Sequence, residues 1–341
     1  MIVEALDTEK SWKEHDFVTM PAKSVCVVRY GGFGDMIQMS SVLPQLKADG
    51  YHVTVNTSPD GFNIIKDDPN IDAVFLQEKD QVPNEELWMY WDKMREGFDK
   101  FVQFSESIEG ALLALPGRKE YDISKKARHK RMNRNYFAQM HSIAGVALPP
   151  KPKFFPTELE ALRADKYLEE LGEGPVILWS LSGSSVHKAW PYTDMVVAQT
   201  LMDYEGAKIV FVGDEICQIL EDPWRHESRI KRESGRMSIR DTLTLAQRVD
   251  LVVGPETGVL NAVAFEDVEK ILLLSHSSKV NLGGTWPRTA VMEPARTPCY
   301  PCHKLHYGWG TCSRDEVTGG ALCAANISPN KVYAALRRAL K

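Results

Sequence analysis

The sequence predicts an α/β protein of two domains, each built on a parallel sheet. Its 341 residues exceed what one hydrophobic core usually organises, because domains average roughly 150 residues. Apolar, β-branched runs also alternate with segments of helical periodicity along the chain. That alternation is typical of a parallel sheet covered by helices on both faces.

The alternation runs through the first half and restarts in the second. Strands are expected at residues 24–30, 51–56, 71–76 and 98–104, with helices at 36–46, 84–96 and 131–147. Four prolines within residues 148–156 exclude a helix or central strand there and indicate a linker. In the second half, strands are expected at 176–181, 207–213, 251–254 and 270–274, with helices at 193–204, 238–249, from 257, and at 331–339. We therefore divide the chain into residues 1–150 and 151–341, with the last helix a candidate to pack back onto the first domain.

The composition excludes several classes of protein. Hydrophobic residues make up 43% of the chain and charged residues 26%, which excludes wholesale disorder. A net charge of -5 gives no global reason to expect a nucleic-acid partner. The first 20 residues lack the apolar core of a signal peptide, and no apolar run reaches the roughly 20 residues that span a bilayer. We expect a cytoplasmic protein.

The turn after the first strand carries candidate chemistry, because ligands bind beyond the carboxyl ends of parallel strands. Gly31, Gly32 and Gly34 lie in this turn, but their spacing differs from that of a dinucleotide site. Asp35 follows at the start of a helix. Its carboxylate would either be stabilised there by the helix dipole or take a proton from an attacking hydroxyl.

Two turns of the second half are candidate anion sites. Ser182 and Gly183 follow a strand, and their small side chains let backbone amides face a phosphate, while Lys188 would neutralise a departing diphosphate. A polar loop with a solvated lysine is the alternative. Residues 254–258 again lead from a strand into a helix and expose amides and the Thr257 hydroxyl.

The order of three motifs resembles that of glycosyltransferase family 9, which contains the ADP-heptose:lipopolysaccharide heptosyltransferases. These motifs are Arg29-x4-Gly34-Asp35 with its helix, Lys188-x-Trp190-Pro191, and the turn of residues 254–258. The resemblance covers residues 24–340. It implies a GT-B fold, in which two Rossmann-like domains face a central cleft, and inverting transfer of a heptosyl or hexosyl group in lipopolysaccharide biosynthesis. It also implies a nucleotide-diphosphate sugar as co-substrate, with ADP-heptose or a related ADP-sugar favoured, and no metal or other cofactor for catalysis.

The resemblance also implies roles for individual residues. By position, Asp35 is similar to the general base, Lys188 to the diphosphate contact, and Thr257 with Gly258 to the phosphate-binding helix start. Residues 235–239 resemble the stretch that lies against the nucleotide base. The candidate donor-binding residues are Ser182, Gly183, Lys188, Gly213, Met237, Ser238, Glu256, Thr257 and Gly258. The candidate acceptor-binding residues are Gly32, Phe33, Lys126, Arg128 and Arg131.

The sequence departs from the family pattern at Glu256 and Asn261, where the family usually has aspartate and histidine. Glu256 would bind sugar hydroxyls or cap the helix. The donor sugar therefore need not be a heptose, and two alternatives stay open: a non-hydrolysing sugar-nucleotide epimerase, and a degenerate protein that binds a nucleotide sugar without turning it over.

Residues 118–134 contain eight lysines and arginines against two acids. Such a run is commonly a solvated surface. On the acceptor-binding half it would bind a phosphorylated or saccharide acceptor, such as a lipid-linked lipopolysaccharide core, and a nucleic-acid acceptor stays open as well. A lipid-linked acceptor would bring the protein to the periphery of the inner membrane.

Four cysteines are close together near the C-terminus, in the pattern Cys299-x2-Cys302-x9-Cys312-x10-Cys323. A single C-x-x-C pair is only part of a zinc-ribbon pattern. A structural zinc ion, reduced buried thiols and disulfides all remain compatible with this spacing.

Overall fold

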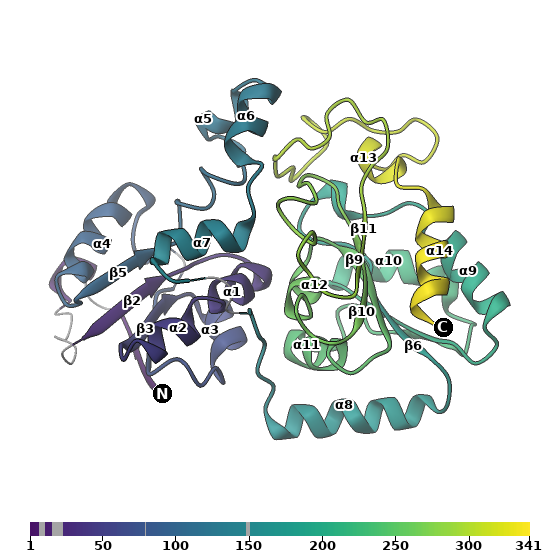
Figure 1. Ribbon diagram of the computed structural model, residues 1–341, viewed down its shortest axis with the longest axis horizontal. Helices are drawn as coiled ribbons and strands as arrows, with labels where there is room; N and C mark the ends of the chain where they lie inside the picture. Colours follow the sequence, from purple (N-terminus) through teal and green to yellow (C-terminus); the bar gives the residue numbers. More distant parts are fainter. Residues whose placement is uncertain (7–10, 16–22, 79, 148–150) are drawn as a thin grey trace. The chain divides into compact units, whose positions relative to one another are not determined.

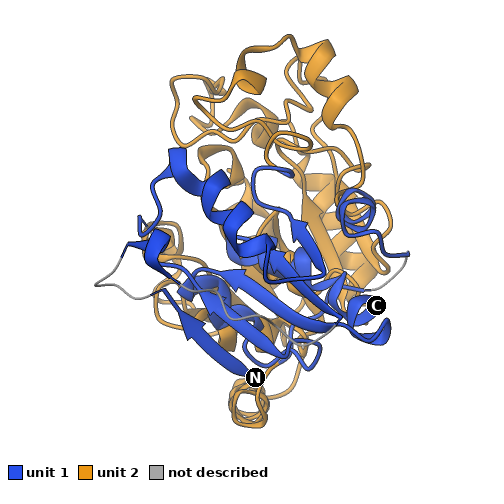
Figure 2. Ribbon diagram, turned by 90° about the vertical axis from the view of Figure 1, so that its left-hand side faces the viewer, with its two compact units in different colours: residues 1–108, 137–155 blue, residues 109–136, 156–341 orange. Residues whose placement is uncertain are grey.

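The computed structural model describes residues 1–6, 11–15, 23–78, 80–147 and 151–341. The chain divides into two compact units (Figure 2). Unit 1 comprises residues 1–108 and 137–155, and unit 2 comprises residues 109–136 and 156–341. The boundary expected at residue 150 falls in a segment, 148–150, outside the described residues. Residues 109–136 pack with unit 2, a feature that the alternation of strands and helices does not indicate.

Unit 1 is built on a parallel sheet in the order β1, β4, β3, β2, β5. The strands are β1 (Ile2–Ala5), β2 (Ser24–Val28), β3 (His52–Thr57), β4 (Ala73–Leu76) and β5 (Lys100–Gln103). Its helices are α1 (Phe33–Ser40), α2 (Leu43–Ala48), α3 (Pro59–Ile65), α4 (Leu87–Arg95) and α7 (Tyr136–Ala144), with 3-10 turns at Trp12–Glu14 and Asn84–Glu86. Every residue of β2 is buried, as its continuous apolar sequence predicts for a central parallel strand.

Unit 2 is built on a second parallel sheet, in the order β11, β10, β9, β6, β7, β8. Its strands are β6 (Val176–Ser180), β7 (Lys208–Val212), β8 (Ile230–Arg232), β9 (Leu251–Pro255), β10 (Glu269–Leu273) and β11 (Thr289–Met292). The chain runs outward from β6 to β8, returns to β9 beside β6, and runs outward again to β11. This order is that of a doubly wound dinucleotide-binding sheet, with its switch point between β6 and β9.

Helices cover both faces of the unit 2 sheet. Figure 1 shows α11 (Ile239–Ala246) and α12 (Gly258–Ala262) on one side, with α9 (Thr193–Asp203) and α14 (Pro329–Ala339) on the other. The remaining helices are α5 (Lys119–Asp122), α6 (Lys125–Met132), α8 (Glu158–Leu171), α10 (Gln218–Glu221) and α13 (Leu322–Ala325), with 3-10 turns at Val186–Lys188, Glu215–Cys217 and Asp222–Trp224. Among the helices of the described ranges, none is long and apolar enough to cross a membrane.

The last helix, α14, packs against α9, β10 and β11 of unit 2. Val332 and Leu336 are fully buried there, in the same apolar cluster as Trp179 of β6. The apolar face of α14 is therefore used within unit 2, and packing of this helix onto the first domain stays a prediction.

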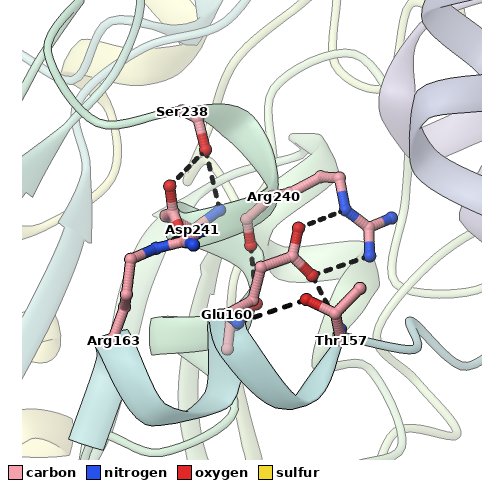
Figure 3. A network of polar contacts seen from close by, with 7 residues as sticks. Thr157, Glu160, Arg163, Ser238, Arg240 and Asp241 are labelled. Carbon is pink, nitrogen blue, oxygen red and sulfur yellow. Dashed lines mark hydrogen bonds and ion pairs between the residues drawn. The ribbon is translucent and has the colours of Figure 1, made fainter.

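A buried ion pair joins α8 to α11 (Figure 3). Arg240 donates through Nε to Oε1 of Glu160 at 2.6 Å and through Nη2 to Oε2 at 2.8 Å. The backbone N–H of Thr157 also donates to Glu160 Oε2, at 2.7 Å, while the Thr157 hydroxyl accepts the N–H of Glu160 and caps the helix. Burial raises the pKa of Glu160, but Arg240 and the Thr157 N–H outweigh it and lower the pKa to about 2.

We predict that Glu160→Ala lowers the free energy of unfolding by about 3 kcal/mol at pH 7, because the buried Arg240 guanidinium loses its anion. The folded-state pKa of Glu160 lies below its ordinary value of 4.5, so its stabilisation is present above that pH and is lost as the pH falls towards 2. Urea denaturation of wild type and variant across this range measures both effects. A difference in stability that stays constant down to pH 2 would contradict the assignment.

The matched control is Arg163→Ala, which removes a second ion pair between the same two helices. Arg163 Nε lies 3.0 Å from Oδ1 of Asp241, and the arginine side chain is 48% exposed. Because exposed pairs contribute little, this variant should lose less than about 1 kcal/mol.

Candidate functional site

The turn after β2 lies at the switch point of the unit 1 sheet, where β3 and β5 flank β2 on opposite sides. The backbone N–H of Tyr30 donates to Ser105 Oγ at 2.8 Å, which joins the turns that follow β2 and β5. Gly31 has a φ of +144°, and a Cβ there would lie 2.7 Å from Asp35 Oδ2. Only glycine allows the backbone to approach this carboxylate so closely.

Asp35 lies in the first turn of α1 and is held by two donors. The N–H of Gly32 donates to its Oδ2 at 2.9 Å, and Nη2 of the buried Arg29 lies 2.7 Å from its Oδ1. The Asp35 side chain is still 37% exposed, and the neighbouring Gly32 and Phe33 are also exposed. The carboxylate is therefore fixed in orientation and open to solvent at the carboxyl end of β2.

The switch point of unit 2 brings together several of the candidate donor-binding residues. Lys188 donates through Nζ to the carbonyl oxygen of Glu256 at 2.7 Å, which links the loop after β6 to the turn after β9. A Cβ at Gly183 would lie 2.9 Å from Lys188 Cδ and 3.1 Å from Thr257 Cγ2. Thr257 is the N-cap residue of α12, with Gly258 first in the helix. Lys188, Thr257 and the glycine loop with Ser182 thus form one group.

Glu256 belongs to this group through its backbone only. Its side chain is 2% exposed and turns inward, where Oε1 accepts the N–H of Ser275 at 2.8 Å and Oε2 lies 2.6 Å from His276 Nδ1. Burial raises the pKa of Glu256, but His276, Lys188 and the Ser275 N–H outweigh it and lower the pKa. Asn261 likewise faces its own helix, because Nδ2 donates to the Thr257 carbonyl at 2.9 Å.

Gly213 follows β7, and Met237 and Ser238 come after β8. The carbonyl of Gly213 accepts the N–H of Gly235 at 3.0 Å, and Ser238 caps α11 by accepting the N–H of Asp241. Met237 lines a cavity of about 290 Å³ between α8 and α11, together with Tyr167 and other residues of both helices.

The basic segment lies in unit 2 and divides into buried and exposed cations. Arg128 is buried and donates through Nε to the carbonyl of Cys302 at 2.6 Å and through Nη1 to the carbonyls of Ile123, at 2.6 Å, and Tyr121, at 3.3 Å. Arg131 is half-exposed and lies 3.5 Å from Glu120, while Lys126 is exposed. We had placed this segment on the acceptor-binding first domain, and its packing in unit 2 corrects that placement. The guanidinium of Arg128 donates to three backbone carbonyls and so has a structural role in this segment.

The four C-terminal cysteines line one cavity of about 140 Å³ in unit 2. All of them are free thiols, and Cys302 Sγ lies 3.8 Å from His306 Nε2. Across the described part of the chain, no group of three or more His, Cys, Asp or Glu side chains is arranged to hold a metal ion. The thiols therefore share a cavity without forming a closed set of ligands.

Ser275 and His276, which contact Glu256, are not among the residues that the sequence motifs single out. They come two and three residues after the end of β10, so they lie at the same carboxyl edge as the turns after β6 and β9. The same rule that singled out those turns would have found them.

Each unit has the parallel sheet of a Rossmann-like domain, and together they define the GT-B class. No protein-family model and no curated protein sequence matches the chain. Solved structures do match in fold. The glycosyl transferase family 9 protein from Veillonella parvula DSM 2008 has a TM-score of 0.66 at 15% identity, covering 95% of this chain and 98% of its own.

Two further structures share the fold. Escherichia coli ADP-heptose lipopolysaccharide heptosyltransferase II has a TM-score of 0.62 at 15% identity, covering 93% of this chain and 98% of its own. The iron-containing dodecameric glycosyltransferase TibC from enterotoxigenic E. coli H10407 has a TM-score of 0.58 at 12% identity, covering 94% of this chain and 77% of its own. The predicted GT-B fold is confirmed, and the resemblance to family 9 holds in three dimensions.

We predict that Arg128→Met lowers the free energy of unfolding by about 2 kcal/mol, because buried carbonyls lose a charged donor. The exposed Lys126→Met variant is the control and should change it by less than about 0.5 kcal/mol. Urea denaturation at neutral pH measures both. Equal stability of the two variants would contradict a structural role for Arg128.

Proposed function

We propose that this protein is an inverting glycosyltransferase that uses a nucleoside-diphosphate sugar and needs no metal for catalysis. One observation carries the proposal: a glycine loop, a lysine and a helix start meet at the switch point of the unit 2 sheet. Doubly wound sheets bind nucleotides at this point, and this combination suits a diphosphate. The fold shared with heptosyltransferase II favours an ADP-sugar, ADP-heptose or a related one, as the donor.

The residues of unit 2 would stabilise the leaving group. As the bond between the anomeric carbon and the β-phosphate oxygen breaks, the electron pair leaves with the nucleoside diphosphate, which gains negative charge. The Lys188 ammonium and the amides at Thr257 and Gly258 would offset that charge. Met237 and Ser238, with Gly213 beside them, would lie against the base of the nucleotide.

Asp35 would act as the general base. The acceptor hydroxyl gives its proton to the Asp35 carboxylate, and its oxygen attacks the anomeric carbon from the side opposite the leaving phosphate, which inverts the configuration. Arg29 and the Gly32 amide support this role, because they fix the carboxylate while leaving it exposed. Proton transfer by a positioned side chain is worth about 10² to 10⁴ in rate.

The acceptor would be a saccharide, or a phosphorylated or lipid-linked molecule, bound in part by Gly32, Phe33, Lys126 and Arg131. The exposed cations of the basic segment support an anionic acceptor. A lipid-linked acceptor would bring the protein from the cytoplasm to the periphery of the inner membrane. A nucleic acid is the second anionic acceptor to test.

We predict that Asp35→Asn abolishes sugar transfer and leaves donor binding within about threefold, because the amide cannot accept the proton. The donor is first identified by thermal shift with ADP-, UDP-, GDP- and CDP-sugars, since a ligand that binds only the folded state raises its stability. Transfer is then measured with that donor and a saccharide acceptor. Unchanged turnover in the variant would exclude Asp35 as the base.

Incubation of the wild-type protein with the donor alone separates the alternatives. An epimerase converts the sugar nucleotide without an acceptor, whereas a transferase leaves it mostly intact. A degenerate binding protein raises its melting temperature with the donor and turns over neither donor nor acceptor.

We also propose that Cys299, Cys302, Cys312 and Cys323 hold a structural zinc ion. The support is the chemistry of the donors, since the four cysteines line one cavity and cysteine thiolates suit zinc. The ion would have to deprotonate these thiols and draw them together, because their described positions do not form a closed set of ligands. The ion would cross-link the C-terminal loop and would take no part in sugar transfer. Because TibC shares the fold and contains iron, iron is the alternative metal.

We predict about one metal ion per chain in the purified protein, lost in Cys302→Ser and retained in the control Cys26→Ala, since a four-thiolate site needs all its ligands. Elemental analysis by mass spectrometry identifies the metal. Chelation of the metal should lower the melting temperature of the protein. The rate of sugar transfer, measured well below that melting temperature, should stay unchanged. A metal-free wild-type protein, or transfer that stops on chelation of the folded protein, would contradict this assignment.

A further inference from the structure

A closed ring of contacts surrounds Lys188 inside unit 2. The Lys188 ammonium donates to the Glu256 carbonyl at 2.7 Å, and the Glu256 carboxylate accepts the N–H of Ser275 at 2.8 Å. The hydroxyl of Ser275 is hydrogen-bonded to His187 Nδ1, also at 2.8 Å. His187 directly precedes Lys188 in the chain, so the ring holds both the backbone and the ammonium of Lys188.

His276 braces this ring from its buried side. Its Nδ1 lies 2.6 Å from Glu256 Oε2, and its ring packs edge to face against that of His187, with centroids 5.1 Å apart. His187, Glu256 and His276 are each at most 5% exposed. Long lysine side chains are otherwise free to sample many rotamers, which costs affinity when they bind a ligand. A fixed carbonyl anchor reduces that cost.

We propose that His276 is a positioning residue that acts through Glu256 to preset Lys188 for a nucleoside diphosphate. The imidazole fixes the Glu256 side chain, and the backbone of the same residue then presents its carbonyl oxygen to the Lys188 ammonium. The proposal rests on the proposed function, since it deepens the role of the donor-phosphate group. It also gives a role to the Glu256 carboxylate, whose side chain is only 2% exposed.

The first readout needs no nucleotide. An amine-reactive acetylating reagent, followed by peptide mass spectrometry, measures how fast Lys188 reacts. His276→Ala should raise the rate several-fold, because a lysine released from its carbonyl acceptor is more accessible. His276→Gln, whose amide can contact the Glu256 carboxylate in place of the imidazole, should restore the slow rate. An unchanged rate in His276→Ala overturns the proposal.

The second readout is the dissociation constant of ADP in a double-mutant cycle. His276→Ala should weaken ADP binding about tenfold, the effect expected of one hydrogen bond to a charged group. In a Lys188→Met background, the same change should alter binding by less than about twofold, because the residue through which it acts is gone. An undiminished effect in that background assigns His276 a general structural role and overturns the proposal.

Two controls keep the result interpretable. His141→Ala removes a buried histidine of unit 1, bonded to Ser41 Oγ at 3.1 Å, and should leave ADP binding and Lys188 reactivity unchanged. Should His276→Ala fail to fold, Ser275→Ala removes the hydroxyl that bonds to His187 and so breaks the ring. This variant should raise both the acetylation rate of Lys188 and the dissociation constant of ADP. If the wild-type protein binds ADP and the variants change neither the dissociation constant of ADP nor the acetylation rate of Lys188, only the positioning role is overturned. A wild-type protein that binds none of these ligands overturns the proposed function, while the acetylation rate still decides whether the ring holds Lys188.

Discussion

The reversal of strand order between β6 and β9 is the constraint on which the candidate donor site depends. Both strands are parallel neighbours, so their carboxyl ends share an edge, but the chain leaves them toward opposite sides of the sheet. The loops diverge and leave room for a ligand between backbone amides. The contact from Lys188 to the Glu256 carbonyl spans this divergence and ties the two loops into the one group that is proposed to bind the donor phosphates.

The two residues that depart from the family pattern, Glu256 and Asn261, lie in the turn after β9 and in the helix that follows it. A glutamate at position 256 is one methylene longer than aspartate and reaches the Ser275 N–H and His276 behind the turn. A buried carboxylate is unfavourable unless it is paired and hydrogen-bonded, and these partners meet that requirement. Asn261 then bonds to the carbonyl of Thr257. Both side chains are thus used on contacts inside the protein, at the turn and behind it.

The sequence predicted the strands well because buried parallel strands are continuous apolar runs, as in β2 and β6. It missed the edge strands β1, β8 and β11, of which β8 has the sequence Ile-Lys-Arg without an apolar run. It also missed α8, although Thr157 and Glu160 form a recognisable capping box. One helix was expected over 131–147, but the structure has two. Asn281 donates to the carbonyls of Met132 and Arg134 and so replaces the helical hydrogen bonds there, a tertiary contact that no local pattern contains.

The basic segment shows why a count of charges overstates a binding surface. Arg128 and Lys125 donate to backbone carbonyls of the C-terminal loop, and Arg131 faces Glu120. Arg128 and Lys125 thus hold residues 109–136 against the rest of unit 2. The cations that remain for an anionic acceptor are exposed lysines such as Lys126 and the half-exposed Arg131, whose attraction is screened within about 10 Å at 0.1 M salt. The proposed acceptor would therefore be selected more by the shape and hydrogen bonding of its site than by this charge.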